Sequence, residues 1–390
     1  MEAYIITGYR TAVGKATRGG FKQMRSDDLG AEVIKYLLKN VPKLDPERID
    51  DLIVGCAVPE AEQGMQVGRI VSLLSLPQSV SGVTVNRYCG SGLETIAMAV
   101  AKIKAGMADC IVAGGIESMT MVPTMGHKPA LNWKICNEHP DWFLGMGLTA
   151  EEIAKDYGIS RADADAFSCE SHRKALLANQ NGTFAPEICP VNVEEVFVGE
   201  DGKRQTKKFT INVDEGPRET TMEGLAKLKP AFKQNGIVTA GNSSQTSDGA
   251  AFVLVMSEAM VKELGLEPKA RMAAYATHGI DPRIMGMGPI KAIPKALKQA
   301  GLTLNDIDQI ELNEAFAVQS LGVIRDLGLN TDIINLNGGA IALGHPLGCS
   351  GAKLSIQLLN EMTRRNQRYG IVSACVGGGQ GVAGIYERLS

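Results

Sequence analysis

The sequence lacks two features that would set the protein apart from ordinary globular enzymes. No apolar run approaches the ~20 residues that a membrane-spanning helix needs. Basic residues are not in excess either, since the formal net charge is −3 and the isoelectric point is near 6.0. A nucleic-acid-binding domain carries a basic face. We therefore expect no membrane span and no nucleic-acid partner.

The cysteines lack the spacing of a metal site. Eight cysteines occur, but no two form a Cys-x-x-Cys pair or another zinc spacing. The sequence therefore predicts no resident metal and no permanently bound cofactor. Free cysteines are usually buried as small hydrophobic residues. Cys56 and Cys110, at the ends of apolar runs, fit that description.

Targeting signals are also missing from the sequence. The chain enters an apolar, strand-like run at Tyr4-Ile5-Ile6 without the basic segment of a signal peptide. Its last four residues, Glu387-Arg388-Leu389-Ser390, lack the Ser-Lys-Leu signal for peroxisomes. We expect a cytoplasmic location.

The chain is long and rich in glycine. Its 390 residues exceed the roughly 250–300 at which a single core stops growing. Two domains, or one fold duplicated, are therefore expected. The 44 glycines cluster at loops and do not form linkers.

An internal repeat supports duplication. Ile49-Asp50 matches Ile307-Asp308, and Ser91-Gly92 matches Ser350-Gly351, at an offset of roughly 258–259 residues. Further along, Val100 and Ile103 match Leu359 and Met362. Each half alternates apolar strand-like runs with helical patterns, which predicts an α/β fold with a mixed sheet covered by helices.

The stretch between the halves does not repeat. Within residues 119–244, Ser160 to Asp163 has the pattern of a helix capping box. A hairpin is predicted from Val196-Phe197-Val198 to Lys208-Phe209, with its turn near Asp201-Gly202. We interpret this stretch as an inserted domain that covers the substrate.

Three glycine-rich loops carry the candidate chemistry. They are VNRYCGSGL around Cys89, NGGAIALGHPLGCSG around His345 and SACVGGGQG around Cys375, and NEAF begins at Asn313. Together they supply a nucleophilic thiol, a base, a second thiol to carry a proton, and amide donors for an oxyanion. Acyl transfer through a thioester requires such a set.

Cys89 is the predicted nucleophile. It follows a strand-like run and precedes a helix, so we expect helix N-terminal amides to favour its thiolate. His345, held by Pro346, is the predicted base. The other four histidines, His127, His139, His172 and His278, lie in less distinctive contexts, and we expect surface or loop roles for them.

At these motifs, and along almost its whole length, the chain resembles the thiolase family, which exchanges acyl groups between 3-ketoacyl-CoA and CoA. The resemblance implies the thiolase fold, two mixed-sheet halves in a five-layer αβαβα arrangement about a pseudo-twofold axis. It divides the chain into a first half (1–118 and 245–268), an inserted loop domain (119–244) and a second half (269–390).

The resemblance also assigns roles to residues. Cys375 would move the α-proton or activate CoA, Gly377 would donate to an oxyanion with the Cys89 amide, and Asn313 would act with His345 on the thioester oxygen. The role of Glu314 stays open. The remaining candidates, for binding CoA or the acyl chain, are Phe232, Ser244 and Phe316 beside pantetheine, Arg218 at the phosphate or adenine end, and Met146 along the acyl chain. CoA is a substrate here, and the implied partners are a homodimer or homotetramer and a β-oxidation complex.

Alternatives remain at two levels. A ketoacyl synthase shares the duplicated fold but uses two histidines, or a histidine and an asparagine, where this chain has Asn313 and Cys375. A non-catalytic CoA or lipid carrier would not need all three reactive residues.

Among thiolases, TTMEGLAKLKPAF and VTAGNSSQTSDGAA favour the degradative 3-ketoacyl-CoA branch. Short-chain acetoacetyl-CoA thiolases commonly carry a histidine where this chain has Gly145 before Met146. Met119, Met121, Met125 and Met146 are predicted to line the acyl path or to fill the core of the loop domain.

Overall fold

Two half-sheets with the same connectivity form the framework of the protein. The computed structural model describes residues 2–389. In the first half, β3 pairs in parallel with β5, and β8 then pairs antiparallel with both β5 and β1. In the second half, β10 pairs in parallel with β11, and β12 pairs antiparallel with both β11 and β9. The shared order confirms the predicted duplication.

The strands of the framework have the following bounds: β1 (Ala3–Arg10), β2 (Gly14–Lys15), β3 (Asp51–Gly55), β4 (Ser81–Val85), β5 (Cys110–Ser118), β8 (Ser247–Ser257), β9 (Ala270–Gly279), β10 (Gln309–Leu312), β11 (Tyr369–Val376) and β12 (Gln380–Arg388). The two half-sheets meet at one pair, Ile5 with Ala270, and so form a continuous sheet of ten strands.

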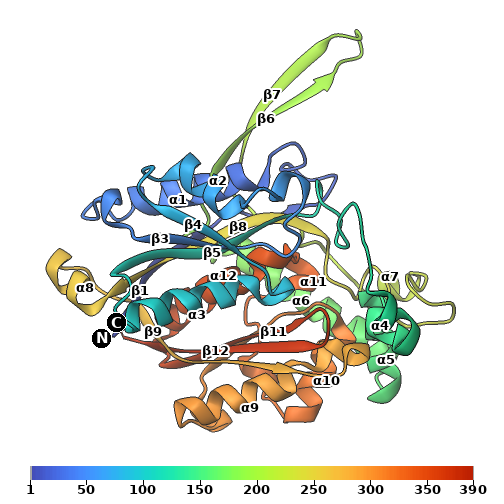
Figure 1. Cartoon of the computed structure of the whole chain (residues 1–390). Helices are drawn as coiled ribbons and strands as arrows, with labels where there is room; N and C mark the ends of the chain where they lie inside the picture. Colours follow the sequence, from blue (N-terminus) through green and yellow to red (C-terminus); the bar gives the residue numbers. More distant parts are fainter. Residues whose placement is uncertain (1, 390) are drawn as a thin grey trace.

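Helices cover both half-sheets and separate them. Figure 1 shows five layers: an outer helical layer, the first half-sheet, a central helical layer, the second half-sheet and a second outer helical layer. The predicted αβαβα architecture is confirmed. The helices of these layers are α1 (Ser26–Lys39) and α2 (Val67–Ser75) on one outside, α3 (Ser91–Lys104) and α12 (Leu347–Arg365) in the centre, and α9 (Pro289–Ala300) and α10 (Ala317–Leu327) on the other outside.

The central helices α3 and α12 touch each other at equivalent glycines of the repeat. A Cβ atom built on Gly92 would lie 2.6 Å from the amide nitrogen of Ala352, and one built on Gly351 would lie 2.5 Å from that of Leu93. Real Cβ atoms do not come so close to backbone, so the two helices can approach this far only without side chains there. The reciprocal contact brings the N-terminal turns of α3 and α12 together.

The segment between the halves contains the predicted elements. Its hairpin extends away from the body of the protein in Figure 1, with Gly202 in the turn at φ 73°. The capping box of Ser160 and Asp163 is present at the start of α6. The elements of this segment are α4 (Trp133–Glu138), α5 (Met146–Asp156), α6 (Arg161–Gln180), β6 (Val191–Val198), β7 (Arg204–Ile211) and α7 (Met222–Ala226).

The buried hydrophobic clusters agree with the duplication of the fold into two halves. Val100 and Ile103 of α3 share one buried cluster with Leu359 and Met362 of α12, as their matching positions in the repeat predict. A second cluster joins Ile153 of α5 to the second half.

The domain boundaries inferred from the sequence stay predictions. Within residues 2–389, no helix combines the length and the apolar character that crossing a membrane would require. Two short helices complete the chain, α8 (Glu258–Leu264) and α11 (Ala340–Leu343).

Candidate active site

Cys89 sits on a tight turn between β4 and α3. The turn is a short 3₁₀ segment from Tyr88 to Gly90, and Tyr88 adopts a left-handed backbone conformation with φ 43°. Such a conformation costs a non-glycine residue on the order of 1 kcal/mol and recurs at functional sites. It is held in place because the side-chain oxygen of Asn86 accepts the Tyr88 amide at 2.8 Å. The turn presents the cysteine at the start of the central helix.

The second thiol and a backbone amide meet Cys89. The amide of Gly377 and the amide of Cys89 itself donate toward the Cys89 sulfur. Cys375, at the end of β11, lies close enough that burial and the Cys89 sulfur both raise the pKa of its thiol. The glycine loop after β11 therefore lies over the sulfur of the predicted nucleophile.

Burial dominates the ionisation of the nucleophile. It raises the pKa of Cys89 to about 12, although the two backbone amides oppose the shift. We expected a low pKa from the helix N-terminus, and that expectation is wrong for the resting site. The dipole acts only over the first turn and is weak against full desolvation of a thiolate. The thiol must therefore lose its proton to a base.

His345 precedes α12 at the position equivalent to the Cys89 turn, and it is 4% exposed. The hydroxyl of Ser350 donates to the carbonyl of Pro346 at 3.0 Å, so it accepts from Nδ1 of His345 at 2.5 Å. This assigns the proton to Nδ1 and leaves Nε2 as the acceptor. Asn313 donates its side-chain amide to that Nε2 at 3.3 Å. The basic nitrogen and the Asn313 amide therefore belong to one polar group.

The imidazole is neutral at rest. Burial lowers the pKa of His345 to about 3, and the buried charge of Lys353 adds to the effect. The thiol and imidazole pKa values move in the directions that keep both groups uncharged. A neutral thiol and a neutral imidazole are the resting state from which general-base catalysis starts.

The sequence interpretation missed Glu117, a buried carboxylate near the end of β5. It accepts the backbone amides of Ala57 and Gly348, both at 2.8 Å, and the side-chain amide of Gln63 at 2.7 Å. Gly348 belongs to the first turn of α12, where a negative charge is favourable. The available signal was a glutamate that directly follows the apolar run CIVAGGI.

Two serines that hold His345 were also missed as site residues. Besides Ser350, the hydroxyl of Ser247 accepts the His345 amide at 3.2 Å. Serines are too common in loops for the sequence alone to indicate this role. Gly344, directly before His345, has no side chain that could indicate the hydrogen-bond partners of this histidine.

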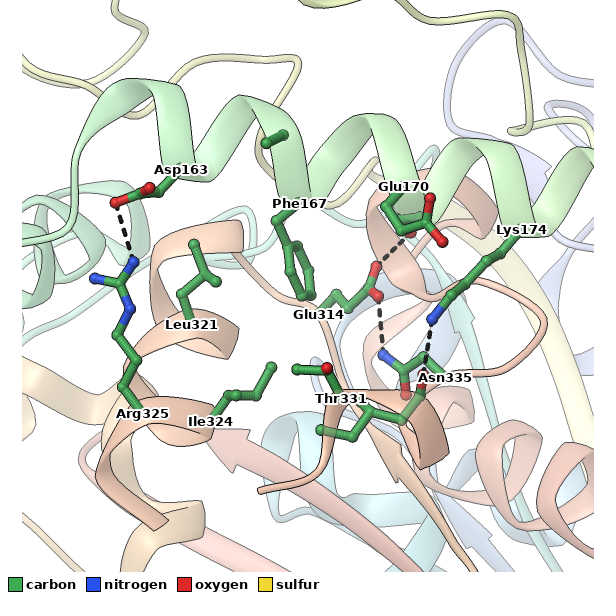
Figure 2. Close-up of a pocket in the computed structure, with 13 residues that line it drawn as sticks. Asp163, Phe167, Glu170, Lys174, Glu314, Leu321, Ile324, Arg325, Thr331 and Asn335 are labelled. Carbon is green, nitrogen blue, oxygen red and sulfur yellow. Dashed lines mark hydrogen bonds and ion pairs between the residues drawn. The ribbon is translucent and has the colours of Figure 1, made fainter. Parts of the chain in front are cut away.

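Glu314, whose role the sequence left open, lies in a cavity that Cys89 does not line. Figure 2 shows it beside Asn335 and Phe167 in a second cavity of about 300 Å³ between α6 and α10. Its carboxylate accepts from Ser171 at 2.6 Å, Asn335 at 2.8 Å and the Ile341 amide at 3.3 Å. It therefore ties NEAF to the segment that leads to His345.

A cavity of about 440 Å³ opens beside Cys89. Met146, at the start of α5, and Met125 line it, together with Tyr88 and Gly377. Gly145, next to Met146, is exposed, and a Cβ atom built on it would meet no atom within 4 Å. Ligand cavities are commonly 300–1,000 Å³. The cavity has the size and the apolar lining to hold an acyl chain.

The three predicted pantetheine residues lie together. The rings of Phe232 and Phe316 are 6.1 Å apart in an edge-to-face arrangement, and the Ser244 amide donates to the carbonyl of Ala315 at 3.0 Å. Arg218 lies on the surface, and its amide donates to Nδ1 of His172 at 3.4 Å. The binding roles of these residues stay predictions.

One histidine expectation is wrong. His172 is 1% exposed on α6, where burial lowers its pKa to about 4. The neighbours of His172 in the sequence, Ser171 and Arg173, are polar and gave no sign that its ring turns inward, and its partner is a backbone amide. Within residues 2–389, no group of three or more His, Cys, Asp or Glu side chains could hold a metal ion.

Comparisons with known proteins agree with this geometry. Residues 3–259 match the family model of the thiolase N-terminal domain, and residues 266–388 match that of the thiolase C-terminal domain. The chain is 51% identical to the 3-ketoacyl-CoA thiolase of Bacillus subtilis, over 99% of each chain. It is 44% identical to the 3-oxoadipyl-CoA/3-oxo-5,6-dehydrosuberyl-CoA thiolase of Escherichia coli, over the full length of both.

A solved structure is similar over the same extent. The crystal structure of the Bacillus anthracis acetyl-CoA acetyltransferase covers 100% of this chain with 99% of its own, at a TM-score of 0.89 and 35% identity. The predicted resemblance is confirmed by both halves of the sequence and by the arrangement of the layers. The chain belongs to the thiolase family.

Proposed function

We propose that the protein cleaves 3-ketoacyl-CoA with CoA, to give acetyl-CoA and an acyl-CoA shortened by two carbons, through an acyl-Cys89 intermediate. It is an acetyl-CoA C-acyltransferase of fatty acid β-oxidation, and the reaction is reversible. The observation that carries this proposal is the meeting of Cys89, Cys375 and the Gly377 amide at one sulfur. The name of the 51% identical relative supports the substrate class.

The first half of the reaction forms the acyl-enzyme. Cys89 gives its proton to Nε2 of His345 while its sulfur attacks the 3-keto carbon. The negative oxygen that forms is stabilised by the Gly377 and Cys89 amides. The bond between C2 and C3 then breaks, and His345, now protonated at Nε2, and Asn313 donate to the thioester oxygen of the acetyl-CoA enolate. Cys375 gives its proton to the enolate carbon. Acetyl-CoA leaves, and the shortened acyl group stays on Cys89.

The second half returns the enzyme to its starting state. The Cys375 thiolate takes the proton of the incoming CoA thiol, and the CoA sulfur attacks the acyl-Cys89 thioester. The Gly377 and Cys89 amides again stabilise the negative oxygen that forms on that carbon. Shortened acyl-CoA leaves, and the Cys89 sulfur recovers its proton from His345. No proton or electron is gained or lost over the cycle.

The CoA arm is proposed to lie along the Phe232, Ser244 and Phe316 group. The exposed face of Phe232 and the buried Phe316 ring supply an apolar wall, and Ser244 supplies a hydroxyl. Arg218, unpaired in charge among residues 2–389, is proposed to contact the phosphate or adenine end. Met146 is proposed to contact the acyl chain.

Glycine instead of histidine at position 145, beside Met146 of the cavity wall, supports a degradative 3-ketoacyl-CoA thiolase over a short-chain acetoacetyl-CoA thiolase. We expect kcat/KM for thiolysis to be several-fold higher for 3-oxooctanoyl-CoA than for acetoacetyl-CoA, since each buried methylene contributes up to about 0.8 kcal/mol. Gly145→His should reduce that preference, with acetoacetyl-CoA as its internal control. A wild-type enzyme that cleaves acetoacetyl-CoA and rejects every longer substrate would favour the acetoacetyl-CoA thiolase instead.

A homodimer or homotetramer is supported by the free edge of the sheet. Strand β4 ends the sheet and is partly exposed, and such an edge pairs readily with another strand. Leu73 and Leu74 of the neighbouring α2 are 47% and 42% exposed, and Tyr88 is 45% exposed. Light scattering should give a mass of two or four chains, and a monomer would contradict this proposal.

A reducing, cytoplasmic location is supported by the thiols. All eight cysteines lie within residues 2–389 and are free. Disulfides are rare in the cytosol, where thiols stay reduced.

A further inference from the structure

The cavity beside Cys89 has one charged residue in its lining. Aromatic and sulfur-containing side chains form much of its wall, including Tyr88, Met125, Trp142 and Met146. Glu60 is the only Lys, Arg, Asp, Glu or His among the lining residues, as far as the structure describes the chain. A group bound in this cavity therefore meets negative charge and no compensating positive charge.

Glu60 is held in a defined place. Its backbone amide donates to the Val58 carbonyl at 2.8 Å, and one of its carboxylate oxygens accepts the backbone amide of His127 at 3.0 Å. It makes no ion pair with any cationic side chain in the described part of the chain. Its charge is therefore uncompensated, and a backbone amide fixes its direction.

The position of Glu60 is within reach of an acyl tail. Ala57 packs in a small cluster with Cys89, and the wall continues from Ala57 through Val58 to Glu60. Three residues span at most roughly 11 Å. A tail that leaves Cys89 along this wall brings its far end closer to Glu60 with each added carbon.

We propose that Glu60 sets the substrate class of the enzyme by excluding acyl groups that end in a carboxylate. The inference rests on the proposed thiolase function and adds the chemistry of the tail. A second carboxylate in this apolar cavity loses its water, finds no cation and is repelled by Glu60. Substrates with uncharged tails bury apolar surface and meet no such repulsion.

The relatives make this distinction informative. One 44% identical protein is named for 3-oxoadipyl-CoA and 3-oxo-5,6-dehydrosuberyl-CoA, whose acyl groups end in a carboxylate. The 51% identical one is named for 3-ketoacyl-CoA in general. Overall similarity does not separate the two substrate classes, because relatives named for both are 44–51% identical to this chain.

The test compares 3-oxooctanoyl-CoA with 3-oxosuberyl-CoA, which have eight acyl carbons each and differ only at the far end. We expect kcat/KM of the wild-type enzyme to be at least roughly tenfold higher for 3-oxooctanoyl-CoA. The repulsion between two negative charges about 10 Å apart, at an intermediate dielectric, corresponds to a factor of about this size. Glu60→Gln keeps an oxygen for the His127 amide and should reduce the ratio at least threefold or so. Glu60→Lys should reduce it further.

A ratio measured within one variant is independent of how much of that variant folds. Glu194→Gln, on the exposed hairpin, removes the same charge far from the cavity and should leave the ratio unchanged. Equal cleavage of both substrates by the wild-type enzyme, or a ratio that neither Glu60 variant changes, would overturn the proposed role of Glu60. Either result would leave the proposed thiolase function intact. Failure to cleave any 3-ketoacyl-CoA would overturn the proposed function and the inference with it.

Discussion

The corresponding strands β5 and β11 differ in what they carry near their ends. Each lies between a parallel and an antiparallel neighbour, β5 in the first half and β11 in the second. Near its end β5 carries Glu117, whose carboxylate is fully used by the amides of Ala57, Gly348 and Gln63. The end of β11 carries Cys375, which faces the Cys89 sulfur. Equivalent places in the two halves therefore carry a structural carboxylate in one and a proposed catalytic thiol in the other.

The turns before the central helices differ in the same way. The turn before α3 supplies Cys89, the predicted nucleophile, and the turn before α12 supplies His345, the predicted base. Asn313 and Cys375 also come from the second half, so the predicted proton-transfer groups lie on that side. Duplication supplied two equivalent turns, and the chemistry requires that they differ. Four predictions test this division.

The largest effect is expected at the nucleophile. Cys89→Ala should lower turnover by roughly 10⁴-fold or more, because the acyl-enzyme cannot form. Incubation with acetyl-CoA should add one acetyl group to the wild-type protein, located on the Cys89 peptide by mass spectrometry. Cys136→Ala, on α4, is the matched control and should keep the label. Labelling that persists in Cys89→Ala would refute the assignment.

The second effect separates the two proton-transfer groups. His345→Ala should impair both acetylation of Cys89 and turnover, by roughly 10²–10⁴-fold, because it removes the base. Cys375→Ser should lower turnover by a similar factor but leave acetylation by acetyl-CoA less affected, because the base is intact. Rapid-quench labelling and steady-state assays measure the two steps. Equal loss of acetylation in both variants would contradict the division.

The third effect is a dependence of stability on pH. The folded pKa values are about 3 for His345 and about 4 for His172, below the ordinary value of 6.5. The unfolded chain therefore binds more protons, and stability is fully present above pH 6.5 and falls as pH falls. Two such groups give a slope of up to about 2.7 kcal/mol per pH unit.

Urea unfolding between pH 7 and 5 measures this slope before most carboxylates are protonated. His172→Gln keeps an acceptor for the Arg218 amide and should reduce the slope by about half. A stability that does not change with pH over this range would mean that these histidines are accessible to protons in the folded protein.

The smallest effect compares the two strand ends directly. Glu117→Gln should lower the free energy of unfolding by about 1–3 kcal/mol, because one acceptor of a buried group is lost. Cys375→Ser is close in size and should change it by less, while losing far more activity. Thermal unfolding and turnover of both variants give the comparison. A Glu117→Gln variant of normal stability and no activity would assign Glu117 to the chemistry.

Much of this arrangement could be predicted from the sequence because the repeat was still readable. Equal spacing of Ser91-Gly92 and Ser350-Gly351 predicted the central helix pair, and the glycine loops indicated Cys89, His345 and Cys375. The state of the thiol was not predictable in this way. Whether Cys89 is ionised depends on how many atoms from distant segments surround it, and the pattern around the cysteine does not record that.

The supporting residues were hidden for a related reason. Glu117, Ser247 and Ser350 act through backbone amides and an imidazole that come close only in the folded chain. A backbone amide has no identity in the sequence, so its partner cannot be recognised by pairing residue types. His172, buried on α6 beside a backbone amide, was misassigned for this reason.

The contact of Gly92 with α12 and of Gly351 with α3 is the kind that two identical half-length chains would make at a twofold axis. In such a dimer every substitution appears twice, so a residue that suits one turn is forced on the other. Fusion into one chain removes that constraint while the glycines keep the spacing of the turns. An active site with a thiol on one side and an imidazole on the other then becomes possible by single, independent changes, and none of them has to move a helix.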